Sequence, residues 1–115
     1  MLKRLHNYCL TFPGATENIQ WGDDRVYKVA GKMFCCSGIE NDAKFSFKVD
    51  DDRFLELTDR EGILPAPYLA RAKWIQVDPK TTVLKWRDIK PLLEQSYELV
   101  VAKLPKKTQA ALDRP

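Results

Sequence analysis

The spacing of apolar residues changes along the chain and divides it into helical and extended segments. Leu2, Leu5 and Cys9 recur near helical spacing, and Phe12-Pro13-Gly14 interrupts the pattern. Apolar residues at this spacing form one face of an amphipathic helix, and a Pro-Gly pair ends it. The pattern therefore predicts a first helix over residues 1–10.

A different pattern follows between Arg25 and Val49, where short β-favouring runs are separated by Ala30-Gly31 and Asn41-Asp42. Small and turn-favouring residues between such runs are typical of two-residue hairpin turns. The segment is therefore predicted to form a three-stranded antiparallel meander.

The two turns also predict the register of the meander, because opposed residues on neighbouring strands point to the same face. The predicted opposed pairs are Tyr27–Phe34, Lys28–Met33, Cys36–Phe47 and Phe34–Val49. One face then collects large apolar side chains, namely Tyr27, Val29, Phe34, Cys36, Phe45, Phe47 and Val49. The other face collects polar ones and one thiol, namely Lys28, Cys35, Ser37, Lys44, Ser46 and Lys48.

The adjacent cysteines Cys35 and Cys36 fall within the central strand of this meander. Successive strand residues point to opposite faces, so the two sulfurs cannot easily bind one metal ion. The register places Cys36 in the core and Cys35 on the lysine face, opposite Lys48. Three cysteines without a spaced CxxC pair favour free thiols in a reducing compartment, and we expect a cytoplasmic protein without metal or cofactor.

The second half of the chain contains two further helical patterns and one further hairpin pattern. An apolar stripe from Phe54 to Leu57 predicts a middle helix that ends before Gly62, with Asp50–Asp52 at its N-terminus. The runs at 74–78 and 83–86 predict a second hairpin that completes the same sheet.

The last helical pattern is the longest and predicts a helix that starts after an Asp88 N-cap and stops at Pro105. Pro91 would lie in its first turn, where a missing N–H costs little. We predict a single domain over residues 1–105 and a C-terminal tail over residues 106–115. The fold class is α+β: a two-layer sandwich whose antiparallel sheet, a meander plus a hairpin, is covered on one face by the N-terminal, middle and long C-terminal helices.

Composition and motifs point away from catalysis. The chain has 115 residues and a net charge of +3, and no apolar run approaches the length of a membrane span. Its sole histidine, His6, lies beside basic residues, and no nucleophile elbow, phosphate-binding loop or HExxH motif is present. Ser96 and Tyr97 lie in the long helix, where the tyrosine hydroxyl is predicted to tie helix to sheet. We therefore expect a protein that is not an enzyme.

Four segments resemble the MmcQ/YjbR family of small bacterial proteins. They are FPGATENIQWGDD at 12–24, VYKVAGKMFC at 26–35, GILPAPYLARAKWIQV at 62–77 and LLEQSYELVVAKLPKK at 92–107. The resemblance implies a compact α/β unit similar to secretion chaperones and to CyaY-like folds. It also implies the family's usual description, a DNA-binding protein that uses hairpins in a double wing.

The residues that could bind DNA are basic side chains of the meander. Lys28, Lys44 and Lys48 share one predicted face, and Arg25 and Lys32 lie at its ends. Lysines would contact phosphates and bind DNA weakly without reading its sequence. The same lysines would also keep a solvent-facing sheet soluble.

Two other functions remain open from the sequence. A protein-binding or chaperone-like module, or a self-associating one, would use Val26, Met33 and Ile39 among the lysines. A small-ligand pocket would lie beneath the loop at 63–68, near Trp74 and Tyr97. No membrane partner is expected.

Overall fold

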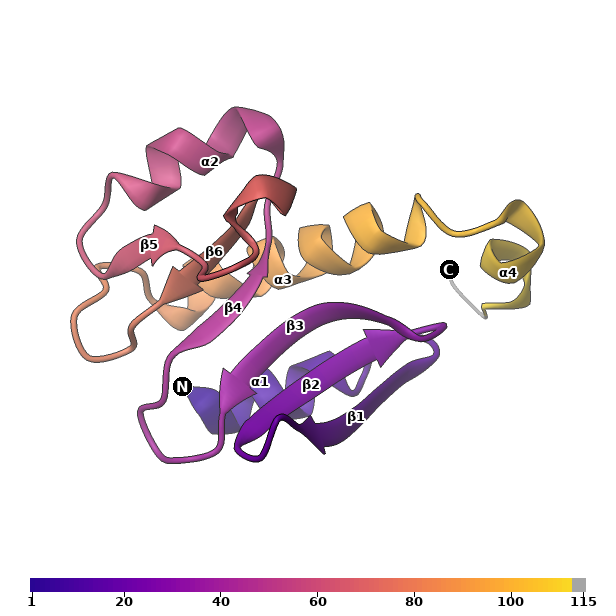
Figure 1. Cartoon of the computed structure of the whole chain (residues 1–115), viewed down its shortest axis with the longest axis horizontal. Coiled ribbons are helices and arrows are strands. Elements are labelled where there is room, and N and C mark those ends of the chain that lie inside the picture. The colour runs from indigo at the N-terminus through magenta and orange to yellow at the C-terminus, as the bar shows by residue number, and fades with distance from the viewer. Residues whose placement is uncertain (113–115) are drawn as a thin grey trace.

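The computed structural model describes residues 1–112 as one open six-stranded antiparallel sheet with helices packed on it (Figure 1). The strand order is β1-β2-β3-β4-β6-β5. The strands are β1 (Ala15–Gln20), β2 (Asp24–Val29), β3 (Lys32–Gly38), β4 (Phe45–Lys48), β5 (Ile63–Pro65) and β6 (Trp74–Val77). The helices are α1 (Leu2–Cys9), α2 (Asp51–Thr58), the short 3-10 helix η1 (Ala70–Ala72), α3 (Trp86–Val101) and α4 (Lys106–Ala111).

One core lies between the sheet and helices α1 and α3, which both run behind the sheet in Figure 1. Helix α3 buries Ile89, Leu93 and Tyr97 along one stripe, and α2 adds Phe54 and Leu57 to the same core. A stripe of this spacing packs a helix onto a sheet. The predicted α+β fold class is therefore confirmed. Among residues 1–112, no helix has the length and apolar character needed to cross a membrane.

The predicted helices are present, with different ends for the last one. Helix α3 begins at Trp86, and the Asp88 carboxylate accepts a hydrogen bond from the Lys85 backbone N–H at 2.9 Å. Asp88 therefore caps the helix from inside its first turn and is not the N-cap itself. Pro91 lies inside the helix rather than in its first turn. Part of the predicted tail forms α4, and residues 113–115 of that tail lie outside the described residues.

The second predicted hairpin is wrong, because residues 83–86 form no strand. Strand β6 pairs instead with β4 and with β5. The sequence pattern predicts a loop where β5 lies. Strand β1 is a further addition to the predicted sheet. Both added strands lie at sheet edges and are short or largely exposed, so neither shows the apolar alternation that predicts a strand.

The predicted register of the meander is correct only next to its first turn. Ala30 and Gly31 form the turn with φ angles of 50° and 78°, and Lys28 opposes Met33 as predicted. The register then shifts, so that Tyr27 opposes Cys35 and Phe34 is the extra residue of a β-bulge. The second turn is a loop over residues 39–44 rather than a two-residue turn at Asn41-Asp42.

The bulge reverses the predicted burial of the two cysteines. Cys35 opposes Phe47 and is fully buried, whereas Cys36 opposes Ser46 and is partly exposed. The predicted Cys36–Phe47 pair is therefore wrong by one residue, and the predicted exposure of Cys35 is wrong as a consequence. The physical cause is that Phe34 and Cys35 both point to the helices, which a regular strand does not allow.

Thiol labelling checks this corrected register. Burial, with a smaller contribution from Asp24, raises the pKa of Cys36 to about 11 from a usual value of 9.0. At pH 8 we expect iodoacetamide to modify Cys36 about 100-fold more slowly than an unperturbed thiol, because the thiolate is the reactive form. Cys35 and Cys9 should react more slowly still. Peptide mapping by mass spectrometry measures all three rates, with urea-unfolded protein as the control; faster labelling of Cys35 than of Cys36 contradicts the register.

Beyond the Cys35–Phe47 pair, strands β3 and β4 separate, and α3 is visible between them in Figure 1. The Ser96 hydroxyl bridges the opening: it donates to the Phe34 carbonyl at 2.6 Å and accepts from the Lys48 N–H at 3.0 Å. Ser96 is fully buried. One side chain of α3 thus replaces the strand-to-strand hydrogen bonds that the divergence removes.

Candidate functional site

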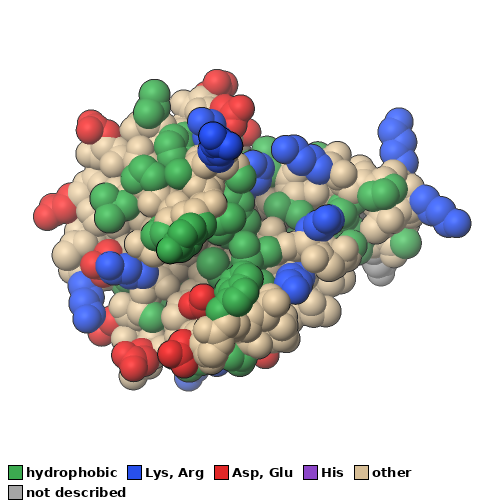
Figure 2. Space-filling view, viewed as in Figure 1, with side chains coloured by type: hydrophobic (Ala, Val, Ile, Leu, Met, Phe, Trp, Pro, Cys, Tyr) green, Lys and Arg blue, Asp and Glu red, His purple; other side chains and the backbone are tan. Residues whose placement is uncertain are grey.

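The sheet face away from α1 and α3, here called the open face, faces the viewer in Figure 1. Strand alternation and pairing place on it a central row formed by Val26, Cys36, Ser46, Gln76 and Leu64. Hydrophobic side chains gather in the middle of this view; basic ones lie above them, towards α4 and at the lower left, and acidic ones lie below them (Figure 2). The open face is therefore the candidate binding surface.

Four of the five predicted DNA-contacting residues lie on or beside the open face. Lys28 alternates with the buried Tyr27 and Val29, and Lys44 and Lys48 flank the buried Phe45 and Phe47 in the same way. Lys32 is exposed at the start of β3. The structure thus brings these lysines to one side of the sheet.

Arg25, the fifth predicted residue, points to the other side of the sheet. Its Nε lies 3.7 Å from a Glu17 carboxylate oxygen, and its Nη1 donates to the His6 Nδ1 at 3.1 Å. Since arginine only donates, His6 accepts through Nδ1, and the Tyr27 hydroxyl lies 3.0 Å from the same nitrogen. The sole histidine therefore joins α1 to the sheet, and Arg25 is not available to the open face.

Three lysines, from β3, from β4 and from the turn after α3, line one groove, here called the lysine groove. Its volume is about 410 Å³, and its lining residues are Lys32, Met33, Lys48, Leu99, Val100, Lys103 and Leu104. None of these described lining residues is acidic. The groove brings Lys103, in the turn after α3, next to the β2–β3 hairpin, a neighbour that no local sequence pattern indicates.

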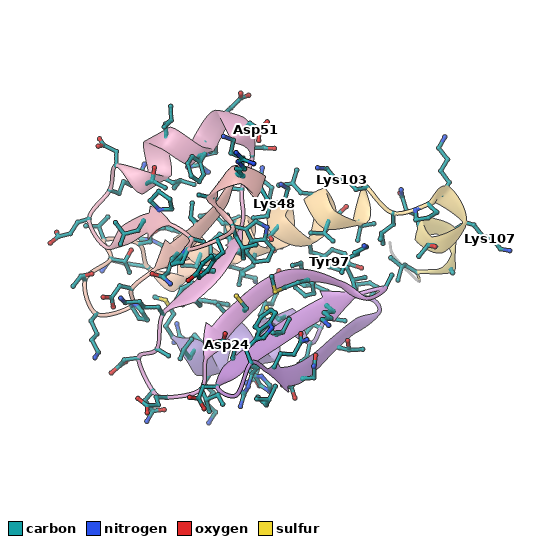
Figure 3. The ribbon with its side chains drawn as sticks, in the orientation of Figure 1. Asp24, Lys48, Asp51, Tyr97, Lys103 and Lys107 are labelled. Carbon is teal, nitrogen blue, oxygen red and sulfur yellow. The ribbon has the colours of Figure 1, made fainter. Side chains whose placement is uncertain are left out.

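Positive charge is crowded around Lys48. Burial lowers the pKa of Lys48, the nearby ammonium groups of Lys103 and Lys73 lower it further, and the Asp51 carboxylate opposes them. Figure 3 shows Lys48 and Lys103 close to the start of α2, where Asp51 lies. The Lys48 ammonium also donates to the Ala72 carbonyl, which holds it at the edge of the groove.

A second depression, here called the hollow, lies over the centre of the open face and has a volume of about 530 Å³. Its floor includes Cys36, Ser46 and Gln76 from three neighbouring strands, and its rim includes Trp21 and Tyr68. Trp21 is 71% exposed and Tyr68 fully exposed, which is unusual for side chains of this size.

Both rim aromatics occupy turn positions that favour small residues. Tyr68 follows Pro67 in a turn closed by the Leu69 N–H and the Ala66 carbonyl at 3.1 Å, and its φ is 66°. This position of a type II turn normally takes glycine or asparagine. Trp21 precedes Gly22 in the β1–β2 turn with a φ of 50°. A bulky residue at positive φ is strained, and such strain concentrates at functional sites.

Met33 lines both the hollow and the lysine groove, so the two depressions adjoin. Lys44 adds a cation and Asp24 a carboxylate to the lining of the hollow, and Asp24 lies well away from Lys103 in Figure 3. Trp21, Tyr68 and Lys103 carry no sequence signal for this role, because isolated aromatics and lysines occur on every protein surface. Only the Trp-Gly and Pro-Tyr turn dipeptides hint at the first two.

The other sequence-predicted sites lie differently. Of the residues predicted to form an exposed apolar patch, Val26 is fully buried and Ile39 is exposed. The hollow does lie beside the loop at 63–68, but Tyr97 points to the opposite side of the sheet, where its hydroxyl donates to the Pro13 carbonyl at 2.6 Å. That hydroxyl ties α3 to the α1–β1 loop rather than to a strand. Residues 1–112 contain no group of three or more His, Cys, Asp and Glu side chains able to hold a metal ion.

Comparisons with known proteins place the chain in a family. A crystal structure of a protein from Pseudomonas syringae, structural genomics target PsR293, is similar with a TM-score of 0.68 and 21% identity. The match covers 84% of this chain and 96% of that one, and shows a shared fold. No curated protein matches the sequence. The YjbR family model matches residues 10–99, and the chain therefore belongs to the YjbR family.

Proposed function

We propose that this protein binds DNA without catalysing a reaction, and that the lysine groove supplies the phosphate contacts. One observation carries the proposal: Lys32, Lys48 and Lys103 line a single groove, and none of its described lining residues is acidic. Lysine ammonium groups gathered in this way attract phosphates and release the counterions condensed on DNA.

The charge crowding around Lys48 supports this use of the groove. Burial and the ammonium groups of Lys103 and Lys73 disfavour a charge on Lys48 more than the Asp51 carboxylate favours it, and a bound phosphate would add a second counter-charge. Lys28 adds a further cation from the neighbouring strand. Such contacts supply affinity but no sequence information, so the binding is weak and sequence-independent, with a dissociation constant of about 10⁻⁴ to 10⁻⁶ M at physiological salt.

A salt titration tests the proposal. If Lys32, Lys48 and Lys103 each meet one phosphate, log affinity for a fluorescent duplex should fall against log salt with a slope of about −3. The triple variant Lys32→Gln, Lys48→Gln and Lys103→Gln should lose most of this slope. Fluorescence anisotropy at a series of salt concentrations measures both proteins, and a urea titration confirms that the variant is folded.

A matched control separates local contacts from overall charge. The triple variant Lys3→Gln, Lys80→Gln and Lys85→Gln removes the same charge from exposed positions outside the groove. It should keep nearly the full slope. Equal slopes for the two variants, or no binding by the natural protein at low salt, would refute the lysine groove as a DNA contact.

A protein partner is the second candidate, and the apolar rim of the hollow is the observation that favours it. Trp21 and Tyr68 are exposed on one face, and exposed aromatic side chains are enriched where proteins meet. In that case the lysines would border a protein interface. The titration distinguishes the two candidates, because a protein-binding module without phosphate contacts lacks the salt slope.

A further inference from the structure

The hollow is not needed for the phosphate contacts of the lysine groove, yet it adjoins that groove at Met33. We propose that the hollow binds unpaired bases of single-stranded DNA, which stack on Trp21 and Tyr68 while the phosphates of the same strand lie along the lysine groove. This inference rests on the proposed DNA binding and adds the form of DNA that is bound.

The two rim aromatics are placed for stacking rather than for stability. Each is exposed and each occupies a backbone conformation that a smaller residue would adopt with less strain. Folding therefore gains little from either ring. Exposed rings beside a basic groove are the elements that single-strand-binding proteins combine, because every base has a face that can stack.

The floor of the hollow favours a base over an apolar peptide side chain. The Gln76 amide and the Ser46 hydroxyl are neighbours across β6 and β4, both line the hollow, and neither side chain hydrogen-bonds to another described residue. An apolar side chain would leave both groups unpaired when it covered them, which costs free energy. The edge of a base offers donors and acceptors to both groups.

The arrangement also selects single strands over duplexes. In a duplex the bases are stacked on one another and paired, so their faces cannot reach Trp21 or Tyr68. A single strand can turn its bases into the hollow and pass its phosphates over Met33 to Lys32 and Lys48. The expected ligand is a short single strand with little sequence preference.

Three DNA molecules of equal length test the inference by fluorescence anisotropy at one salt concentration. They are an oligothymidine strand of about 12 nucleotides, an abasic strand with the same phosphates, and a duplex. The oligothymidine should bind at least about 5-fold more tightly than the abasic strand and the duplex. It should also quench the tryptophan fluorescence of the natural protein.

Two variants remove the rings without harm to the fold. Tyr68→Gly and Trp21→Asn each place a residue that suits the turn, so the free energy of unfolding should stay level or rise. Each should weaken oligothymidine binding by roughly 5- to 150-fold and leave binding of the abasic strand unchanged. Trp21→Asn should also abolish the quenching.

The outcomes separate this inference from the proposed function. Equal binding of the abasic and oligothymidine strands, both salt-dependent, would overturn base stacking and retain the phosphate contacts. No binding of any strand at low salt would overturn both. A dimer in sedimentation that Trp21→Asn or Tyr68→Gly dissociates, or an acidic peptide that binds the hollow more tightly than oligothymidine does, would assign the hollow to protein and overturn the inference.

Discussion

Replacing Gly62 by alanine is expected to destabilise the protein by at least about 3 kcal/mol. Gly62 has a φ of 80°, and an added Cβ would lie 2.4 Å from the backbone N and Cα of Thr82. Backbone atoms cannot move aside as the end of a side chain can. The Gly62 carbonyl also accepts a hydrogen bond from the Asp78 N–H at 2.8 Å, so the loop before α3 is held against the start of β5.

Gly31 provides a matched control for this prediction. Its φ of 78° is almost the same, but nothing lies within 4 Å of an added Cβ. Gly31→Ala should therefore cost only the backbone strain, about 1 kcal/mol. Urea unfolding of both variants measures the difference, which isolates the steric contact with Thr82. Equal losses for the two variants would mean that the β6–α3 loop can move away.

Replacing Ser96 by alanine is expected to cost about 2–4 kcal/mol, because two buried backbone groups lose their partner at once. These are the Phe34 carbonyl and the Lys48 N–H, where β3 and β4 have separated and can no longer pair with each other. The free energy of unfolding in urea measures the cost.

Ser46→Ala is the control for the loss of a serine hydroxyl. Ser46 is also nearly buried on β4, but its side chain forms no hydrogen bond with another described residue. Its replacement should change stability by less than about 0.5 kcal/mol. Amide hydrogen exchange adds a local measurement: Lys48 should exchange faster in the Ser96→Ala variant beyond the global loss of stability. An unchanged Lys48 exchange rate would contradict the bridging role.

The Ser96 bridge also connects stability with the candidate site. Lys48 is held through its backbone by Ser96 and through its ammonium by the Ala72 carbonyl. The position of the central cation of the lysine groove therefore depends on α3. Loss of the bridge should weaken the proposed DNA binding without removing any charge, so the affinity should fall while the salt slope changes little.

The local sequence pattern was sufficient to predict a structural element wherever buried and exposed side chains recur with a regular period over several residues. The stripes of α1 and α3 and the turn at Ala30-Gly31 could be read directly, because helix period and hairpin turns depend on near neighbours. The landmarks shared with the YjbR family could also be recognised without a structure. The edge strands β1 and β5 could not, because exposed edges need no apolar alternation.

The bulge at Phe34 was decided by the tertiary structure. Phe34 packs edge-on against Tyr97 of α3, with ring centroids 5.5 Å apart, while its carbonyl accepts from Ser96. Both partners lie more than sixty residues further along the chain. A one-residue change in register moves every later side chain of the strand to the other face, so the burial of Cys35 and Cys36 followed from these distant contacts.

The sequence by itself determined the α+β class, the principal helices and the lysines that the meander carries to its open face. Only the tertiary structure directed Arg25 to Glu17 and His6, brought Lys103 beside Lys48, and placed both Trp21 and Tyr68 at one hollow. The physical reason is one of range. Periodicity records which way a residue points within its own element, whereas a binding site is made where elements remote in sequence pack together.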